Sequence, residues 1–380
     1  MKVLLVTTSY PDFPGSQRGI FIRKLCLELL KNGLDVLVLT PRILSQSAYF
    51  EDDSGIKVYR FWFPSNNKQL NQMDSIPMIP MIIYMASGLF KALHLIVKYK
   101  PDVIHGNWIV PTGLIAAIAG RILRVPVLNT AHGLDMRISE QQPIRALFEL
   151  AVKLSHKTVI VSPSMKTRGL LQHAEVIPMG VDEVFFRLHP GRNTKTVVYT
   201  RSLESVYDVE TLIRSIPSVI KSVPNVRFII AGTGTQKEHL QSLAQKIGAG
   251  EHSTFLGHLP SDQIPALMEQ ASVYVATALA DGTSPALLEA IAAGLTPVVT
   301  DIEANRSLVN DGQDGFLFKS SDPEDLAKNI IHALSGGIPN AALDRKRQEF
   351  RSRISWNSVA REFISIYNEL TPKTWGVYTE

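Results

Sequence analysis

Apolar residues along the chain gather in short runs that are separated by longer segments of mixed character. The runs are rich in Val, Ile and Leu without polar alternation, which is typical of parallel strands covered by helices on both faces. We therefore predict strands at residues 3–6, 36–39, 58–62, 103–105, 127–129, 159–161 and 176–178, and then at 197–200, 226–231, 254–256, 273–276, 297–300 and 315–318.

The segments between these runs have helical spacing. We predict helices at residues 20–31, 143–154, 208–223, 237–247, 263–271, 285–293 and 356–370. Strands that alternate with helices in both halves predict an α/β protein with two doubly wound, Rossmann-like domains. We expect the boundary between the two domains near residues 180–196, which include His189-Pro190-Gly191. We predict domains at 1–187 and 188–354, followed by a C-terminal helix and tail, 355–380, that packs back across the linker.

Composition narrows the protein class. The chain has 380 residues, of which 45% are apolar and 19% charged, so it can bury the cores of two domains and is not intrinsically disordered. Its single cysteine, Cys26, excludes a disulfide framework and a cysteine zinc site. The net charge is +4 without a dense basic tract, so nucleic acid is not an expected partner.

Targeting signals and membrane spans are also not evident. The first apolar run is too short for a signal peptide, and the uncharged stretch at residues 75–90 is shorter than the roughly 20 residues of a bilayer span. We therefore expect a cytoplasmic protein. Lys91 and Lys98 lie beside apolar residues, and Arg121 and Arg124 follow a further apolar helix. This face could rest on an anionic membrane, or it could be a core helix with a solvated basic edge.

Familiar phosphate-binding patterns are missing. Neither Gly-x-Gly-x-x-Gly after the first strand nor Gly-x-x-x-x-Gly-Lys-Ser/Thr occurs, which argues against a nicotinamide dehydrogenase and a P-loop enzyme. Gly232-Thr233-Gly234 follows a strand, but this pattern fits a tight turn as well as a ligand loop. The loop at residues 9–19, which contains Pro14 and Gly19, is unusually long, and amides at the following helix start could receive an anion.

The segment from Asp281 to Ala290 carries the strongest signal. Ser284 is a natural N-cap and Pro285 suits the first helical position, so a helix N-terminus that can receive a diphosphate opens after a strand. We estimate the carboxylates of Asp281 and Glu289 to be about 10 Å or more apart, too far for a glycosidase pair. They are interpreted as two contacts to an elongated ligand. The alternative is a carboxylate that only stabilises the helix and a solvated glutamate.

Further polar residues stand at strand ends. Arg201 follows the strand 197–200 and suits bidentate phosphate contact, although an isolated arginine there is often a surface residue. His132 follows one strand and His105 ends another, but without metal-ligand spacing, so we expect hydrogen bonds to a polar ligand and no metal site. His105, Asn107 and Trp108 are our candidates for the acceptor side, which we expect in the first domain.

Together these motifs resemble the retaining nucleotide-sugar glycosyltransferases of family 4, which have the GT-B architecture of two Rossmann-like domains facing a central cleft. The family's hallmark of two glutamates separated by seven residues is represented here by Asp281 and Glu289. The resemblance covers nearly the whole chain and rests on segments 9–19, 100–105, 130–133, 161–162, 177–182, 281–290 and 310–317.

The resemblance implies roles for the candidate residues. His132 would lie near the anomeric carbon of the donor sugar, Arg201 would neutralise the departing diphosphate, and Asp281 would bind sugar hydroxyls. Glu289 would hold the ribose, and the base would lie near Gly232 and residues 256–258. The remaining donor contacts would come from Gly19, Tyr207, Leu256, Gly282, Thr283, Ser284, Pro285, Ala286 and Leu287.

The implied reaction transfers a hexosyl unit from a UDP- or GDP-linked sugar to a glycan or lipid-linked acceptor, without metal or further cofactor, in cell-envelope polysaccharide or glycolipid assembly. The implied partners are the nucleotide sugar and the acceptor. The basic, apolar face described above could add an anionic membrane at the inner face of the cell. Two departures stand out: Tyr207 where the family usually has Lys, and the shorter Asp281. The alternatives are a non-catalytic relative that binds nucleotide sugar or a partner, and an epimerase or hydrolase on the same fold.

Overall fold

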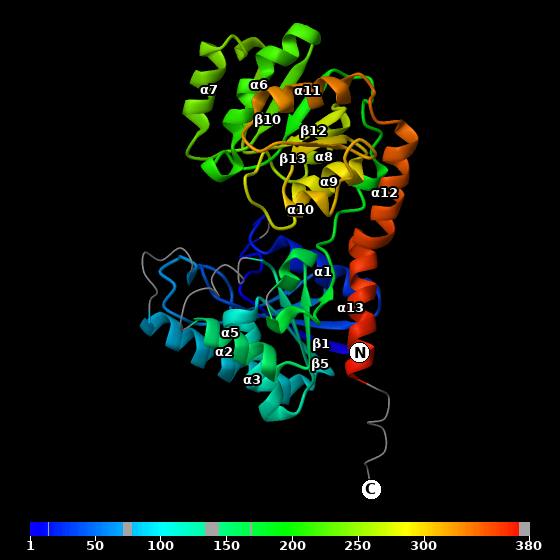
Figure 1. Ribbon diagram of the computed structural model, residues 1–380. Helices are drawn as coiled ribbons and strands as arrows, with labels where there is room; N and C mark the ends of the chain where they lie inside the picture. Colours follow the sequence, from blue (N-terminus) through cyan, green and yellow to red (C-terminus); the bar gives the residue numbers. More distant parts are fainter. Residues whose placement is uncertain (14, 71–77, 134–143, 168, 372–380) are drawn as a thin grey trace. The chain divides into compact units, whose positions relative to one another are not determined.

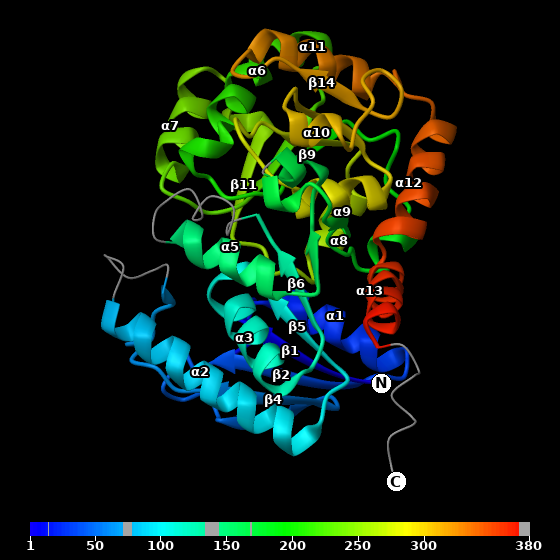
Figure 2. The same ribbon diagram turned by 60° about the horizontal axis from the view of Figure 1, so that its bottom comes forward.

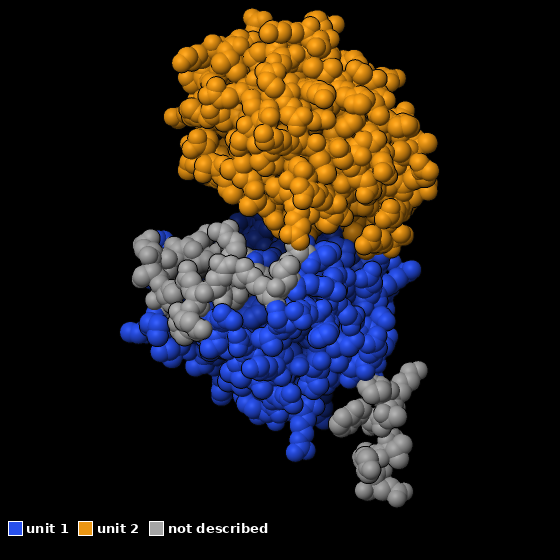
Figure 3. Space-filling model, in the orientation of Figure 1, with its two compact units in different colours: residues 1–180, 356–380 blue, residues 181–355 orange. Residues whose placement is uncertain are grey.

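The computed structural model describes residues 1–13, 15–70, 78–133, 144–167 and 169–371 (Figure 1). The chain forms two compact units, residues 1–180 with 356–380 and residues 181–355 (Figure 3). The predicted domain limits at 187/188 and 354/355 lie close to these boundaries. Parts of four sequence features lie outside the described residues, namely Pro14, residues 75–77, the segment 134–143 and the tail 372–380.

Unit 1 is built on an eight-stranded sheet in the order β3-β4-β2-β1-β5-β6-β7-β8. All neighbours are parallel except β3 (Phe50–Asp53), which pairs antiparallel with β4 at the edge. The strand order reverses between the central neighbours β1 and β5. The parallel strands are β1 (Lys2–Thr7), β2 (Asp35–Pro41), β4 (Ile56–Phe61), β5 (Val103–Asn107), β6 (Val127–Ala131), β7 (Lys157–Ile160) and β8 (Glu175–Val176).

Helices cover both faces of this sheet. One face carries α1 (Ile20–Lys31) and α13 (Trp356–Leu370), which contact each other and share a core with β1 and β2. The other carries α2 (Met78–Tyr99) and α3 (Leu114–Leu123), which lie side by side (Figure 2). Beside β6 and β7 lie η2 (Ile109–Gly113) and α5 (Ile144–Leu154), with short turns η3 (Pro163–Thr167) and η4 (Gly169–Leu171). Gly180 is required at the end of this unit, because a Cβ atom there would meet the Trp356 ring at 2.2 Å.

Unit 2 has a parallel six-stranded sheet in the order β11-β10-β9-β12-β13-β14. Its strands are β9 (Thr196–Tyr199), β10 (Arg227–Ala231), β11 (Ser253–Gly257), β12 (Val273–Ala276), β13 (Thr296–Thr300) and β14 (Phe316–Phe318). One face is covered by α6 (Val209–Ser222), α7 (Lys237–Lys246) and α11 (Pro323–Leu334), and the other by α8 (Ile264–Glu269), α9 (Pro285–Ala293) and α12 (Asn340–Ile354). Shorter elements are η5 (Phe185–Arg187), η6 (Ser205–Tyr207), η7 (Gly250–His252) and α10 (Glu303–Arg306).

The predicted doubly wound α/β fold is confirmed. Every predicted strand is present with its ends shifted by a few residues, and the helices at 20–31, 285–293 and 356–370 have the predicted bounds. The pattern did not predict β3, α10, α11 or α12.

Candidate functional site

The candidate donor residues of unit 2 gather where its strand order reverses. β9 and β12 are hydrogen-bonded neighbours, with Val197 opposite Val273, and ligands of open α/β sheets bind at the carboxyl ends of such strands. Arg201 follows β9, and Asp281 lies between β12 and α9. The fold therefore brings together two side chains that are 80 positions apart in the sequence.

Arg201 and Asp281 form an ion pair that is largely shielded from water. Nη1 of Arg201 donates to Oδ2 of Asp281, and the two side chains keep 11% and 15% of their surface exposed. The other carboxylate oxygen of Asp281 accepts a 2.9 Å hydrogen bond from the Gly282 amide. Charge-assisted bonds of this kind are strong, so the protein itself holds both side chains in position.

Two tyrosines pack near this guanidinium. Cζ of Arg201 lies 4.2 Å from the ring centroid of Tyr207, a cation–π contact. The Tyr207 carbonyl accepts a 2.6 Å bond from Thr277 Oγ1, which ties η6 to the segment after β12. Tyr274 on β12 is fully buried. Burial raises the pKa of its phenol, although the nearby Arg201 opposes that shift, so the group is a neutral hydroxyl.

The N-terminus of α9 is capped as predicted. Ser284 has an extended backbone, and its Oγ accepts a 3.3 Å bond from the Leu287 amide. Pro285 occupies the first turn, and Gly294 ends the helix with a φ of 82°. The positive end of the helix dipole therefore lies directly after the Asp281 loop.

The residues expected to touch the donor here differ in exposure. The Leu287 side chain belongs to the core of unit 2, and its amide donates to Ser284 Oγ. A contact of Leu287 with the donor stays a prediction. Gly282 and Pro285 are exposed, Ser284 is buried, and Asp281, Thr283, Ala286 and Glu289 are half-buried.

Close backbone packing explains the Gly-x-Gly after β10. A Cβ atom on Gly232 would lie 2.0 Å from the Arg201 carbonyl oxygen, and one on Gly234 would lie 2.4 Å from that of Leu203. The Gly232 amide donates to the Gly257 carbonyl at 2.7 Å. Gly232 therefore lets the β10 loop approach the backbone that carries Arg201. Leu256, the predicted neighbour of the base, is 44% exposed on β11.

In unit 1, Gly19 sits at the start of α1 in a conformation that only glycine adopts easily. Its φ is 64°, and a Cβ atom there would lie 2.3 Å from the Ser9 carbonyl oxygen. The loop between β1 and α1 is therefore folded tightly back on itself at the carboxyl end of β1.

Buried arginines hold this loop, and the sequence analysis missed them. Arg18 donates to both carboxylate oxygens of Asp12 at 2.6 and 2.8 Å. Arg60 has no exposed side-chain surface and donates to the Pro11 carbonyl at 2.7 Å and to Glu51 at 2.6 Å. Arg60 could have been noticed in the sequence, because it stands inside the apolar run of β4 and arginines are rarely buried unless they are paired.

His132, Asn107 and Trp108 form one cluster beside β5 and β6. Nε2 of His132 donates to Oδ1 of Asn107 at 3.0 Å, and its ring lies 4.8 Å from Trp108 and 5.3 Å from Phe21. Burial lowers the pKa of His132 to about 3, so the imidazole is neutral at physiological pH. Trp108 has a φ of 63° and is half-buried.

His105 is a core residue and cannot touch an acceptor, in contrast to its assignment from the sequence. It has no exposed surface, and its ring nitrogens contact Tyr367 Oη at 2.7 Å and Thr130 Oγ1 at 2.8 Å. Burial lowers its pKa to about 3. Its position inside a strand covered by α13 explains why a histidine stands in an apolar run.

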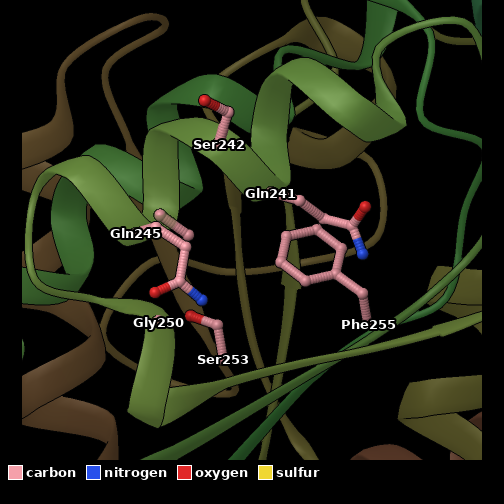
Figure 4. Close-up of a pocket in the computed structure, with 7 residues that line it drawn as sticks. Gln241, Ser242, Gln245, Gly250, Ser253 and Phe255 are labelled. Carbon is pink, nitrogen blue, oxygen red and sulfur yellow. The ribbon is translucent and has the colours of Figure 1, made fainter.

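Two hollows lie elsewhere on the described surface. Within the described ranges, no group of three or more His, Cys, Asp or Glu side chains is arranged to hold a metal ion. A hollow of about 310 Å³ lies between α7 and β11, lined by Gln241, Gln245 and Phe255 among others (Figure 4). A second hollow of similar volume is lined by Phe186, Asp344, Arg347, Gln348 and Arg351. Neither hollow includes a residue predicted to bind donor or acceptor.

Comparisons with known proteins agree with one another. Residues 181–352 match the glycosyl transferases group 1 family, and residues 13–163 match the glycosyl transferase 4-like family. The putative glycosyltransferase EpsD of Bacillus subtilis is 31% identical over 71% of this chain and 77% of its own length. An uncharacterized glycosyltransferase of Methanocaldococcus jannaschii is 23% identical over 97% of this chain and 98% of its own.

The fold is also similar to solved structures. HepE of Anabaena, solved in complex with UDP, has a TM-score of 0.71 and 18% identity, over 97% of this chain and 100% of HepE. Another HepE structure contains UDP-glucose. The GT-B fold expected from the sequence is thereby confirmed.

Proposed function

This chain belongs to the group 1 glycosyl transferases, and on that premise we propose that it is a retaining hexosyltransferase. It would move a hexosyl unit from a UDP- or GDP-linked sugar to a hydroxyl of a glycan or lipid-linked acceptor and form an α-glycosidic bond. The observation that carries the proposal is the shielded Arg201–Asp281 pair between the carboxyl ends of β9 and β12 and the N-terminus of α9. The nucleotides bound to HepE support a nucleotide-sugar donor.

In the proposed donor site, the ion pair between Arg201 and Asp281 holds both side chains in position before the donor binds. Arg201 contacts the diphosphate, because a guanidinium has five N–H donors and the bond to Asp281 uses Nη1. Asp281 accepts hydrogen bonds from sugar hydroxyls, and Glu289 in α9 holds the ribose. Charge that develops on the leaving diphosphate is stabilised by Arg201 and by the helix dipole.

We propose that the reaction needs no metal ion and no further cofactor. Arg201 and the amides at the start of α9 supply positive potential for the diphosphate without one. Tyr207 stands where related enzymes usually have a lysine and adds no charge. Stabilisation of the leaving group therefore depends on Arg201 more than the family pattern implies.

Unit 1 supplies the remaining proposed roles. Gly19 and the start of α1 contact the diphosphate, since an anion is favoured at a helix N-terminus. His132 contacts the donor sugar as a neutral imidazole whose orientation Asn107 fixes. Asn107 and Trp108 are the proposed acceptor-side residues.

We propose that the acceptor belongs to cell-envelope polysaccharide or glycolipid assembly and that the enzyme works at the inner face of the cell membrane. The exposed apolar side of α2 in unit 1 supports this location.

Tyr207 also supports a second candidate, a relative that binds nucleotide sugar or a partner without turnover. Loss of one cation at the diphosphate would reduce catalysis more than binding. The shielded Arg201–Asp281 pair favours the catalytic proposal, because a protein that only binds does not need a buried cation aimed at a leaving group.

A thermal-shift panel with UDP, GDP, ADP, CMP and NAD, with and without magnesium, tests the proposal. A ligand at 100 times its dissociation constant adds about 2.7 kcal/mol, which raises the midpoint by about 5–10 °C for a unit of this size. We expect one nucleoside diphosphate to shift the midpoint equally with and without magnesium. Glu289→Ala should abolish that shift, whereas Glu251→Ala, an exposed control in η7, should keep it.

The same panel separates the outcomes. No shift with any nucleotide contradicts the donor site. A shift that requires magnesium contradicts metal independence. A shift without release of nucleoside diphosphate from the matching sugar nucleotides favours the non-catalytic candidate.

A further inference from the structure

The helix α2 is anchored to unit 1 by one side only. Gly88 lets it approach α3 closely, because a Cβ atom there would lie 2.7 Å from Ile115 Cδ1 and 3.3 Å from the Phe61 ring. The inward-facing residues are Tyr84, Gly88, Ala92, Leu95 and Ile96. The helix is therefore a fixed layer of the fold over β2 and β4, about 33 Å long.

The opposite side of α2 is apolar and open to solvent. Its large exposed apolar residues are Met78 (67%), Ile79 (71%), Ile82 (62%), Phe90 (76%) and Val97 (64%). Ala86 and His94 are exposed on the same side. At 100° per residue the five large residues fall within an arc of about 120°, whose centre lies about 130° around the helix from the centre of the buried residues. Five large apolar side chains on one ridge exceed the scattered exposure that is normal for a protein surface.

The charged residues of α2 are all basic. The sequence has no Asp or Glu between Asp74 and Asp102, whereas Lys91, Lys98 and Lys100 lie in that stretch. The neighbouring α3 continues the pattern with exposed Arg121 and Ile122. The surface thus combines an apolar ridge with a cationic flank. In this flank, Nζ of Lys91 lies 5.5 Å from the ring centroid of Tyr59, and Nζ of Lys98 lies 5.1 Å from that of Tyr99.

We propose that the ridge of Met78, Ile79, Ile82, Phe90 and Val97 is a docking surface for an anionic lipid bilayer. The apolar side chains enter the interface and Lys91 and Lys98 pair with lipid phosphates. The helix lies along the membrane. Of the described helices it alone has the length and hydropathy of a membrane span, yet its inner side belongs to the core of unit 1, so leaving that core would expose the sheet.

Charge decides between a bilayer and a second copy of this chain. A two-fold interface would place the same ridge on both subunits. Lys91 and Lys98 of both copies would then lie along the edge of the interface, and α2 offers no acidic partner for them, which is unfavourable. An anionic bilayer offers the complementary charge. The docking surface deepens the membrane location in the proposed function, because a lipid-linked acceptor would reach unit 1 from the same surface.

Vesicle co-sedimentation of the full chain tests this surface. We expect binding to phosphatidylcholine vesicles that contain about 30% phosphatidylglycerol, and weaker binding to pure phosphatidylcholine. The double variant Ile82→Ser/Phe90→Ser should bind at least about tenfold more weakly. Lys91→Gln/Lys98→Gln should lose most of the preference for anionic vesicles, about 30-fold. The control Leu170→Ser/Val184→Ser, with exposures of 43% and 45%, should bind like the wild type.

Three results would overturn the inference. The first is no binding of the wild type to anionic vesicles at low salt. The second is equal binding of the Ile82/Phe90 variant and the control. The third is a wild-type dimer in sedimentation velocity that the Ile82/Phe90 variant converts to a monomer, which would assign the ridge to self-association. The nucleoside diphosphate shift, measured on the same variants, reports the donor site independently of membrane binding.

Discussion

Replacement of Tyr207 by leucine tests whether its aromatic ring contributes to stabilising the leaving diphosphate, where related enzymes usually have a lysine. The ring centroid of Tyr207 lies 4.2 Å from Cζ of Arg201, whose side chain is only 11% exposed. A cation–π contact that is shielded to this degree contributes about 1–2 kcal/mol. If that energy holds the guanidinium against the leaving diphosphate, Tyr207→Leu should lower turnover about 5- to 30-fold.

The assay is the initial rate of nucleoside diphosphate release at saturating donor, with water as acceptor if no sugar acceptor is known. Tyr207→Phe is the matched control, since it keeps the ring and removes only the hydroxyl, and it should stay within about twofold of the wild type. Nucleotide affinity, measured by calorimetry, should change less than turnover, because the contact matters most when charge develops on the diphosphate.

Equal rates for Tyr207→Leu and Tyr207→Phe, both close to the wild type, would refute the role of the ring. A Phe variant as slow as the Leu variant would assign the effect to the hydroxyl instead. Thermal midpoints of both variants within about 1 °C of the wild type would show that unit 2 is intact.

Three further predictions concern stability. Ser284→Ala removes the cap of α9 and should cost about 1 kcal/mol in thermal unfolding, whereas Ser242→Ala, exposed within α7, should be neutral. Gly19→Ala should destabilise unit 1 in urea unfolding by more than Gly15→Ala, because both have positive φ but only Gly19 faces a backbone atom at 2.3 Å; an equal loss would contradict the clash. Tryptophan fluorescence reports this unit, since Trp62, Trp108 and Trp356, the tryptophans among the described residues, belong to it. The pKa of His105 is lowered to about 3, so the unfolded chain binds the proton first as pH falls, and stability drops below about pH 6.5, by about 2 kcal/mol at pH 5. His105→Gln should remove this contribution and leave that of His132, whose pKa burial also lowers to about 3, so the slope should become about half as steep. An unchanged slope would exclude His105 as one of its sources.

The strands could be predicted because both faces of each sheet are buried, which leaves a continuous apolar run in the sequence. The edge strand β3 lacks that signal: its sequence is Phe-Glu-Asp-Asp, and its side chains alternate between exposed and half-buried. The helix α12 was missed for a similar reason. It is highly charged and buries only Leu343, Phe350 and Ile354.

Individual residues of the candidate site could be predicted from the sequence, but their positions relative to one another in space could not. Strand ends and a helix cap mark Arg201, Asp281 and Ser284 locally. The pairing of Arg201 with Asp281 depends on β9 lying next to β12, and strand order is not a local property of the sequence. His105 was misassigned because the helix that covers it, α13, lies far away in the chain.

The path of the chain sets the order in which the protein can finish folding during synthesis. Residues 181–355 form unit 2 without interruption, so this unit is complete once they have left the ribosome. The core of unit 1 also needs Trp356, Phe363 and Tyr367 of α13. Domains usually complete folding from the N-terminus. Here unit 1 leaves the ribosome first but completes its core last, because α13 is synthesised after unit 2. Until α13 packs against them, β1 and α1 expose an apolar face that chaperones can bind.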